Sequence, residues 1–127
     1  MSNKNNAIFF LCMLKDHYVL GSCIAAYCHK LYLKKIKKKI DLVIMCDNYI
    51  YKKYNSTLKL YFDRVINIKL NTFNFSNSYN PSKKYNWVKH SLTKWESLKF
   101  TEYNKILFLD IDMLPNHKYF YNLFDFN

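Results

Sequence analysis

The chain has 127 residues, of which half are apolar and 19% are aromatic, and it carries a formal net charge of +11. This length allows one domain at most, and the apolar content argues against a disordered chain. No apolar run is long enough to cross a bilayer, and the polar first six residues do not resemble a secretory signal. We therefore expect a cytoplasmic protein without a membrane span.

The positive charge comes almost entirely from lysine, because Arg64 is the only arginine. Arginine is the residue best suited to bidentate recognition of bases and phosphates. Lys, Asn, Ile, Tyr and Phe all have AT-rich codons, so mutational bias explains much of the charge. We therefore expect no nucleic-acid partner. A basic module that binds nucleic acid or an anionic membrane surface, without enzymatic activity, stays open as an alternative function.

The order of the apolar runs predicts alternating strands and helices. Strands are expected at residues 7–14, 40–46, 64–68 and 105–109. Helices are expected at residues 18–35, 49–61 and 91–100, with a last short helix or turn at 119–126, and Asp47 with Asn48 is a good N-cap pair. Residues 69–84, rich in Asn, Ser and Phe, predict a loop. This order predicts an α/β fold, a doubly wound and mostly parallel sheet with strand order 3-2-1-4.

The cysteines and the glycine argue against several kinds of site. The four cysteines form no Cys-x-x-Cys pair and lie in apolar stretches, so we expect buried thiols and neither a zinc site nor a disulfide framework. Gly21 is the only glycine, which excludes a dinucleotide-binding fingerprint. A glycine in the first turn of a helix is unfavourable, and close packing on the sheet would explain it.

The strongest chemical signal is the stretch from Ile106 to Pro115, where Asp110 and Asp112 directly follow an apolar strand. Two like charges this close repel each other and resist burial, and a divalent cation relieves both effects. Oxygen ligands suit magnesium, manganese or calcium better than zinc. In strand order 3-2-1-4 these carboxylates lie at the switch point between the first and fourth strands, where open α/β sheets bind ligands. The plain alternative is a polar turn with two solvated aspartates.

Three stretches together resemble the family-8 glycosyltransferases, the glycogenin and galactinol-synthase group with its insect-virus members. The first is the apolar run from Ala7 followed by Asp-His-Tyr-Val-Leu-Gly at residues 16–21. The second is Thr-Lys-Trp at residues 93–95, and the third is residues 102–112, with Tyr-x-Lys, an apolar strand and Asp-x-Asp. The resemblance covers nearly the whole chain but only the N-terminal half of a typical member.

The resemblance implies that residues 1–127 form the nucleotide-sugar-binding part of a GT-A-like domain. That part would serve metal-dependent, retaining transfer of a hexose from a UDP-sugar to an unknown acceptor, with Mn²⁺ or Mg²⁺ as the cofactor. Asp112 is implied as the first metal ligand, and Asp110 as a second ligand that also contacts the ribose. The remaining implied nucleotide contacts are Ile111 between them, Lys94 on a phosphate, Tyr18 stacked on the uracil and Leu11 in the base pocket. The catalytic residue stays unidentified.

Two departures from the family bear on activity. The family's second half, with its acceptor site, a His metal ligand and a further phosphate-binding Lys, has no counterpart after Phe124. We therefore expect an apparently truncated form that is partial or inactive on its own. Residues 12–15 also lack the small side chains that the family often has there. His117 follows Asp112 closely, but Pro115 intervenes, so we expect a surface histidine and no metal ligand.

The strand at residues 105–109 would be an exposed edge of the sheet, although it is apolar. This predicts a homodimer or a second polypeptide along that strand. A haloacid-dehalogenase-like phosphatase is a further alternative, because its nucleophilic Asp also follows an apolar strand. That family needs Lys and acidic residues well downstream of the motif, and only a short tail follows Asp112 here.

Overall fold

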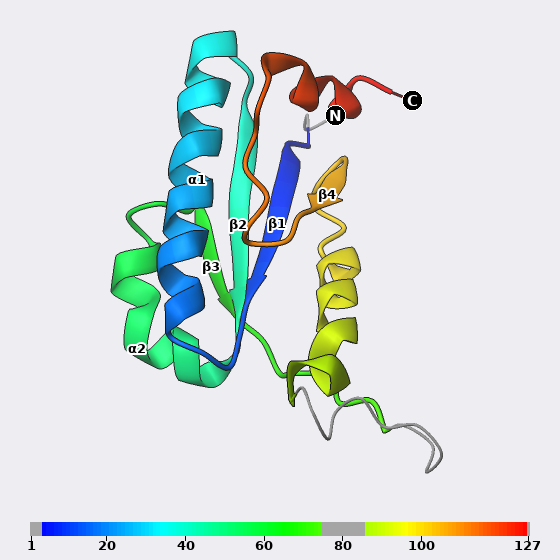
Figure 1. Cartoon of the computed structure of the whole chain (residues 1–127). Helices are drawn as coiled ribbons and strands as arrows, with labels where there is room; N and C mark the ends of the chain where they lie inside the picture. The colour runs from blue at the N-terminus through cyan, green and yellow to red at the C-terminus, as the bar shows by residue number, and fades with distance from the viewer. Residues whose placement is uncertain (1–3, 75–85, 127) are drawn as a thin grey trace.

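The computed structural model of the chain describes residues 4–74 and 86–126. The elements in chain order are β1 (Asn6–Cys12), α1 (His17–Ile36), β2 (Ile40–Cys46), α2 (Asn48–Leu58), β3 (Arg64–Asn67), the 3₁₀ helix η2 (Asn86–Lys99), β4 (Ile106–Phe108) and the 3₁₀ helix η3 (Lys118–Phe124). The described strands form one parallel sheet in the order β3-β2-β1-β4 (Figure 1). The predicted doubly wound α/β fold and its strand order are confirmed.

Strand β1 lies at the centre of this sheet, and its pairing with β2 is much longer than its pairing with β4. It pairs with β2 along its whole length, from Asn6 opposite Ile40 to Cys12 opposite Cys46. It pairs with β4 over three residues, 7–9. The chain moves outward from β1 through β2 to β3 and then crosses to the other side for β4. The strand order therefore reverses between β1 and β4, and their carboxyl ends meet there.

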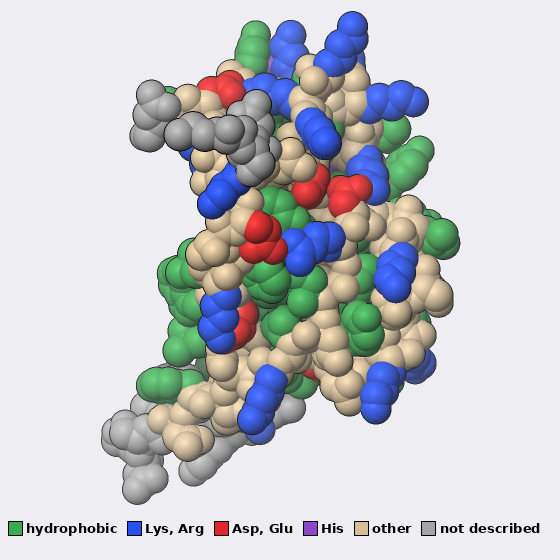
Figure 2. Space-filling model, turned by 180° about the vertical axis from the view of Figure 1, so that it is seen from behind, with side chains coloured by type: hydrophobic (Ala, Val, Ile, Leu, Met, Phe, Trp, Pro, Cys, Tyr) green, Lys and Arg blue, Asp and Glu red, His purple; other side chains and the backbone are tan. Residues whose placement is uncertain are grey.

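The alternation of side chains along β1 and β2 divides the core between the two faces of the sheet. One face carries Ile8, Phe10, Leu42 and Ile44, which are fully buried under α1, α2 and η3. On the other face, Phe9 packs on Phe100 and Tyr103, with ring centroids 5.2 and 5.7 Å apart. Figure 2 shows this second face, where hydrophobic side chains gather across the middle of the molecule.

Arg64 stabilises the second face. Its guanidinium donates to the Glu102 carboxylate at 2.8 Å and to the Tyr103 hydroxyl at 3.1 Å. It also lies 5.6 Å from the Phe100 ring centroid. The sole arginine thus links β3 to the segment before β4, and this position explains its presence without a nucleic-acid partner.

The structure differs from the sequence predictions mainly at the ends of elements. Strand β1 ends at Cys12, two residues early, because Leu14 has a φ of 71° that no strand accommodates. The predicted helix at 91–100 is a 3₁₀ helix that begins earlier, and Ser91 lies inside it, with its hydroxyl donating to the Val88 carbonyl. Residues 75–84 of the predicted loop lie outside the described residues.

The four cysteines are free. Cys12, Cys23 and Cys46 are buried, as the sequence predicted, whereas Cys28 is only half-buried. Burial raises the pKa of Cys12 to about 11 and raises that of Cys46 as well, so these thiols stay protonated. The explanation offered for Gly21 is wrong. A Cβ at this position would lie 4.0 Å from the Ile111 carbonyl oxygen, an ordinary contact, so no close packing demands glycine.

After β4 the chain turns back on the α1 side of the sheet, and we call residues 113–126 the return segment (Figure 1). Its η3 helix buries Tyr121, whose hydroxyl lies 2.9 Å from Nδ1 of His29 in α1. His29 itself is fully buried, and burial lowers its pKa to about 4, with a smaller opposing effect from the Met113 backbone. The return segment therefore fills the core beside α1.

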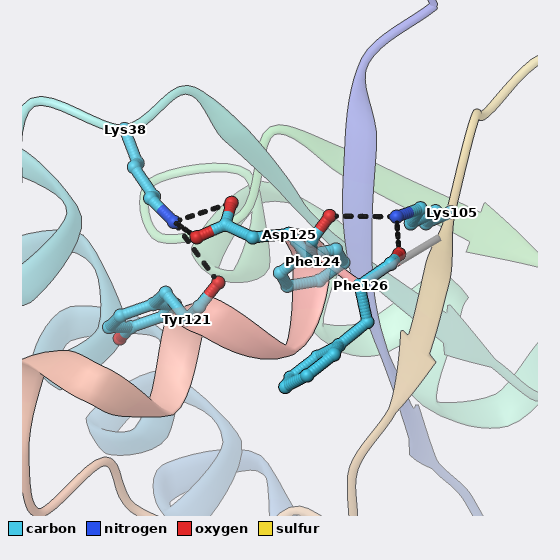
Figure 3. Close-up of polar contacts among 6 residues, drawn as sticks. All are labelled: Lys38, Lys105, Tyr121, Phe124, Asp125 and Phe126. Carbon is cyan, nitrogen blue, oxygen red and sulfur yellow. Dashed lines mark hydrogen bonds and ion pairs between the residues drawn. The ribbon is translucent and has the colours of Figure 1, made fainter.

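Two lysines hold the end of the return segment (Figure 3). Lys38 binds the Asp125 carboxylate at 2.7 and 2.9 Å and donates to the Tyr121 carbonyl at 3.3 Å. Lys105, the residue before β4, donates to the carbonyls of Phe124 and Phe126. The segment is thus tied both to the chain just after α1 and to the start of β4. Among the described residues, no helix has the length and apolar character needed to span a membrane.

Candidate functional site

A pocket of about 490 Å³ opens where the carboxyl ends of β1 and β4 meet. Four segments form its walls: the end of β1, the first turns of α1, one side of η2 and the turn after β4. The six residues that the resemblance implicated all line it: Leu11, Tyr18, Lys94, Asp110, Ile111 and Asp112. Residues from three separate stretches of sequence therefore converge on one cavity at the switch point, although their individual roles stay predictions.

The acidic wall is a turn directly after β4. The Met113 amide donates to the Asp110 carbonyl at 3.0 Å, which closes the turn over Ile111 and Asp112. Both carboxylates are exposed, and within residues 4–74 and 86–126 neither makes a hydrogen bond or an ion pair. Their charge is therefore available to a ligand.

Tyr18 and Leu11 form a second part of the lining. Leu11 lies near the end of β1 and Tyr18 in the first turn of α1, and both are half-buried. The Tyr18 carbonyl accepts a hydrogen bond from the Ser22 hydroxyl at 2.8 Å. The Tyr18 ring lies 4.2 Å from the His17 ring, centroid to centroid. An aromatic ring at the mouth of a pocket can stack on a planar ligand.

Lys94 supplies the positive charge of the site from η2. Side chains three residues apart eclipse each other in a 3₁₀ helix, so Ser91 and Lys94 share the face that lines the pocket. The neighbouring Thr93 is fully buried, and its hydroxyl accepts from the Asn71 amide at 2.9 Å, which anchors η2 to the chain after β3. The Lys94 ammonium lies 5.9 Å from the Trp95 ring centroid and has no acidic partner in the part of the chain that the structure describes.

Sequence reasoning missed several residues of the pocket. The further lining residues are Met13, His17, Gly21, Trp87, Ser91 and Phe108. His17 was not singled out as a site residue, although it directly precedes Tyr18. Ser91 precedes Lys94 by three residues, which puts both on one face of a 3₁₀ helix, whereas Trp87, seven residues before Lys94, carries no such signal.

The residues present fit only part of a metal site. Among the described side chains, no group of three or more His, Cys, Asp or Glu could hold a metal ion. Asp110 and Asp112 offer hard oxygen ligands to magnesium or manganese, and other oxygens must complete the octahedron. The carbonyl and carboxylate chemistry of this turn therefore fits a cation that is shared with an oxygen-rich ligand. His117 is not part of the pocket, and its ring nitrogen accepts from the Tyr119 amide.

Comparison with known proteins gives one distant relative and no family. No family model matches the chain. The uncharacterized protein R707 of Acanthamoeba polyphaga mimivirus is 29% identical over 97 residues, which are 76% of this chain and 32% of that protein. The chain thus spans about a third of the relative that it matches. The resemblance to family-8 glycosyltransferases stays a prediction from the motifs.

Proposed function

We propose that this chain binds a UDP-sugar together with Mn²⁺ or Mg²⁺ and serves a retaining hexosyltransferase in the cytoplasm. One observation supports the proposal above all. Residues 11, 18, 94 and 110–112, which the family motifs imply as nucleotide contacts, all line one pocket. Strand order alone brings Leu11 and residues 110–112 together, so the support comes mainly from Lys94, which reaches the same pocket from η2.

The chemistry requires a diphosphate to leave the anomeric carbon of the sugar. A divalent cation bound to the diphosphate acts as a Lewis acid for the developing negative charge. In this proposal Asp112 and Asp110 hold that cation from the turn after β4. Lys94 neutralises a phosphate from the other side as a point charge. Tyr18 stacks on the uracil, and Leu11 packs beside the base.

The acceptor side of the reaction needs more protein than the described residues provide. β4 pairs only with β1 among the described strands, so its outer edge has no strand beside it there. A second cavity of about 320 Å³ lies at this edge, between Trp95 and Leu98 of η2 and Ile106 and Phe108 of β4. We propose that a second copy or a second polypeptide covers this edge and completes the acceptor site. Alone, the chain should bind the nucleotide without efficient turnover, because water has access to the leaving group.

Calorimetric titration of the purified chain tests the proposal directly. Manganese alone should bind weakly, and it should bind more tightly when UDP is present, because phosphate oxygens complete its octahedron. Equal manganese affinity with and without UDP would contradict the proposal. Retention on DNA that is sensitive to salt and independent of metal would instead favour the basic-module alternative.

Substitution of Tyr18 tests the base contact. Tyr18→Ala should weaken UDP binding by about 1–3 kcal/mol, or roughly 5- to 150-fold in affinity, because it removes one base–aromatic stack. Tyr18→Phe keeps the ring and should cost much less. UDP titration in the presence of manganese measures both variants. Similar losses in the two variants would assign the effect to the hydroxyl and contradict stacking.

A further inference from the structure

The chain between β1 and α1 contains a strained turn. The Lys15 amide donates to the Met13 carbonyl at 2.9 Å, so the turn closes across Leu14 alone. Leu14 has a φ of 71°, the value of the rare classic γ-turn, which is unfavourable for a residue with a Cβ. This conformation persists only where surrounding contacts impose it.

The contact that imposes it comes from Asp47, which lies at the end of β2 and is 7% exposed. One carboxylate oxygen of Asp47 accepts from the Leu14 amide at 2.7 Å. The other oxygen accepts from the Ile50 amide at 2.8 Å and caps α2. One buried carboxylate therefore fixes both the start of α2 and the middle of the γ-turn.

The γ-turn joins two groups of pocket residues. Leu11 and Met13 line the pocket before the turn, and His17 and Tyr18 line it after the turn. The reversal at Leu14 sets the distance and angle between these groups. If the turn relaxed to an ordinary negative φ, the start of α1 would shift relative to the end of β1, and Tyr18 would move with it.

We infer that Asp47 is a positioning residue, which holds the γ-turn at Leu14 so that Tyr18 meets the nucleotide base in the pocket. This inference rests on the proposed function and names the device that shapes its base site. Asp47 does not line the pocket and touches no ligand in this scheme. It acts by keeping the binding-competent turn populated, since apparent affinity falls with the fraction of molecules in that conformation.

Asp47→Asn separates the two tasks of this carboxylate. Asparagine is as good an N-cap as aspartate, so α2 stays capped. Its second side-chain group is an NH₂ donor, which cannot accept from the Leu14 amide. Asp63→Asn is the matched control. The Asp63 carboxylate also accepts from a backbone amide, that of Leu42 at 2.7 Å, and it pairs with Lys30 at 3.3 Å. Asp63 is exposed and lies at the opposite ends of the strands, away from the pocket.

The experiment compares UDP affinity in the presence of manganese, by calorimetry at 25 °C, with thermal unfolding of each variant. Asp47→Asn should weaken UDP binding about tenfold, whereas UDP affinity of Asp63→Asn should stay within about twofold of that of the unchanged chain. Leu14→Pro gives a second route, because proline fixes φ near −65° and lacks the amide that Asp47 binds. Leu14→Pro should lower UDP affinity to a similar extent, and it leaves the Asp47 cap of α2 in place.

The outcomes separate this inference from the proposed function. If Asp47→Asn and Leu14→Pro bind UDP as the unchanged chain does, the positioning role is overturned and the UDP site remains. Equal losses of affinity in Asp47→Asn and Asp63→Asn also overturn it, because the effect would then be general destabilisation. If the unchanged chain binds no UDP, the proposed function fails and the inference fails with it.

Discussion

Asp112→Asn should abolish the effect of UDP on manganese binding. Asparagine keeps the size of the side chain and one carbonyl oxygen, but it loses the negative charge that draws a hard cation to the turn after β4. Loss of a residue that only hydrogen-bonds to a metal ligand typically lowers metal affinity by about 10- to 100-fold. Loss of a direct ligand should cost at least as much, so we expect manganese affinity to fall about 100-fold or more. Calorimetry with UDP present, supported by manganese paramagnetic resonance, measures the change.

Two variants make this result specific. Asp110→Asn should lower manganese affinity less than Asp112→Asn does, because Asp110 is proposed as the second metal ligand, which also contacts the ribose. Asp125→Asn removes an exposed carboxylate that pairs with Lys38 far from the pocket, so it should leave manganese binding unchanged. If Asp112→Asn binds manganese and UDP as Asp125→Asn does, the metal site does not lie at this turn.

Acidification from pH 6.5 to 4 should destabilise the fold through His29. In the unfolded chain this histidine takes up a proton near its ordinary pKa of 6.5, whereas burial delays uptake in the folded chain to about pH 4. The unfolded state therefore binds more protons over this interval, and the free energy of unfolding falls as pH falls. A difference of about 2.5 pKa units corresponds to about 3 kcal/mol, and this stability is fully present only above the unfolded pKa.

Urea unfolding at several pH values, with His29→Gln as the comparison, measures this contribution. Glutamine does not titrate, so the variant should be less stable at pH 7 yet lose less stability between pH 6.5 and 4.5. Glu96 and Glu102 have lowered pKa values because they bind Lys99 and Arg64, and their effect appears at lower pH. If the free energy of unfolding changes with pH in the same way in both proteins, His29 is not the cause of the pH dependence.

The fold was predictable because its two central strands, β1 and β2, are largely buried. β2 begins and ends where the apolar run predicted, at Ile40 and Cys46, since both faces of a central parallel strand exclude polar residues. The end of β1 was not predictable. Met13 and Leu14 continue the apolar run, and nothing in a leucine indicates a φ of 71° or an amide that donates to a buried Asp47, 33 residues later.

The site was predictable where it follows from topology. Strand order 3-2-1-4 brings the ends of β1 and β4 together, so Leu11 and Asp110 had to be close. The nature of η2 was harder to predict, because apolar and polar residues three apart suit both an α-helix and a 3₁₀ helix. Trp87 and His17 were missed for a different reason. Each lies in a polar stretch where the pattern alone gives no direction to the side chain.

The shortness of β4 has a consequence for how the molecule opens. Three residues of pairing with β1 hold this strand, and Lys105 and Lys38 hold the chain that follows it. Segments with few backbone bonds and exposed ends unfold locally at a lower free energy than the central strands do. We therefore expect the acidic turn to open at a lower free energy than the central strands do. A nucleotide bound across the pocket would contact both the acidic turn and α1. The turn and the central sheet would then unfold together as one cooperative unit.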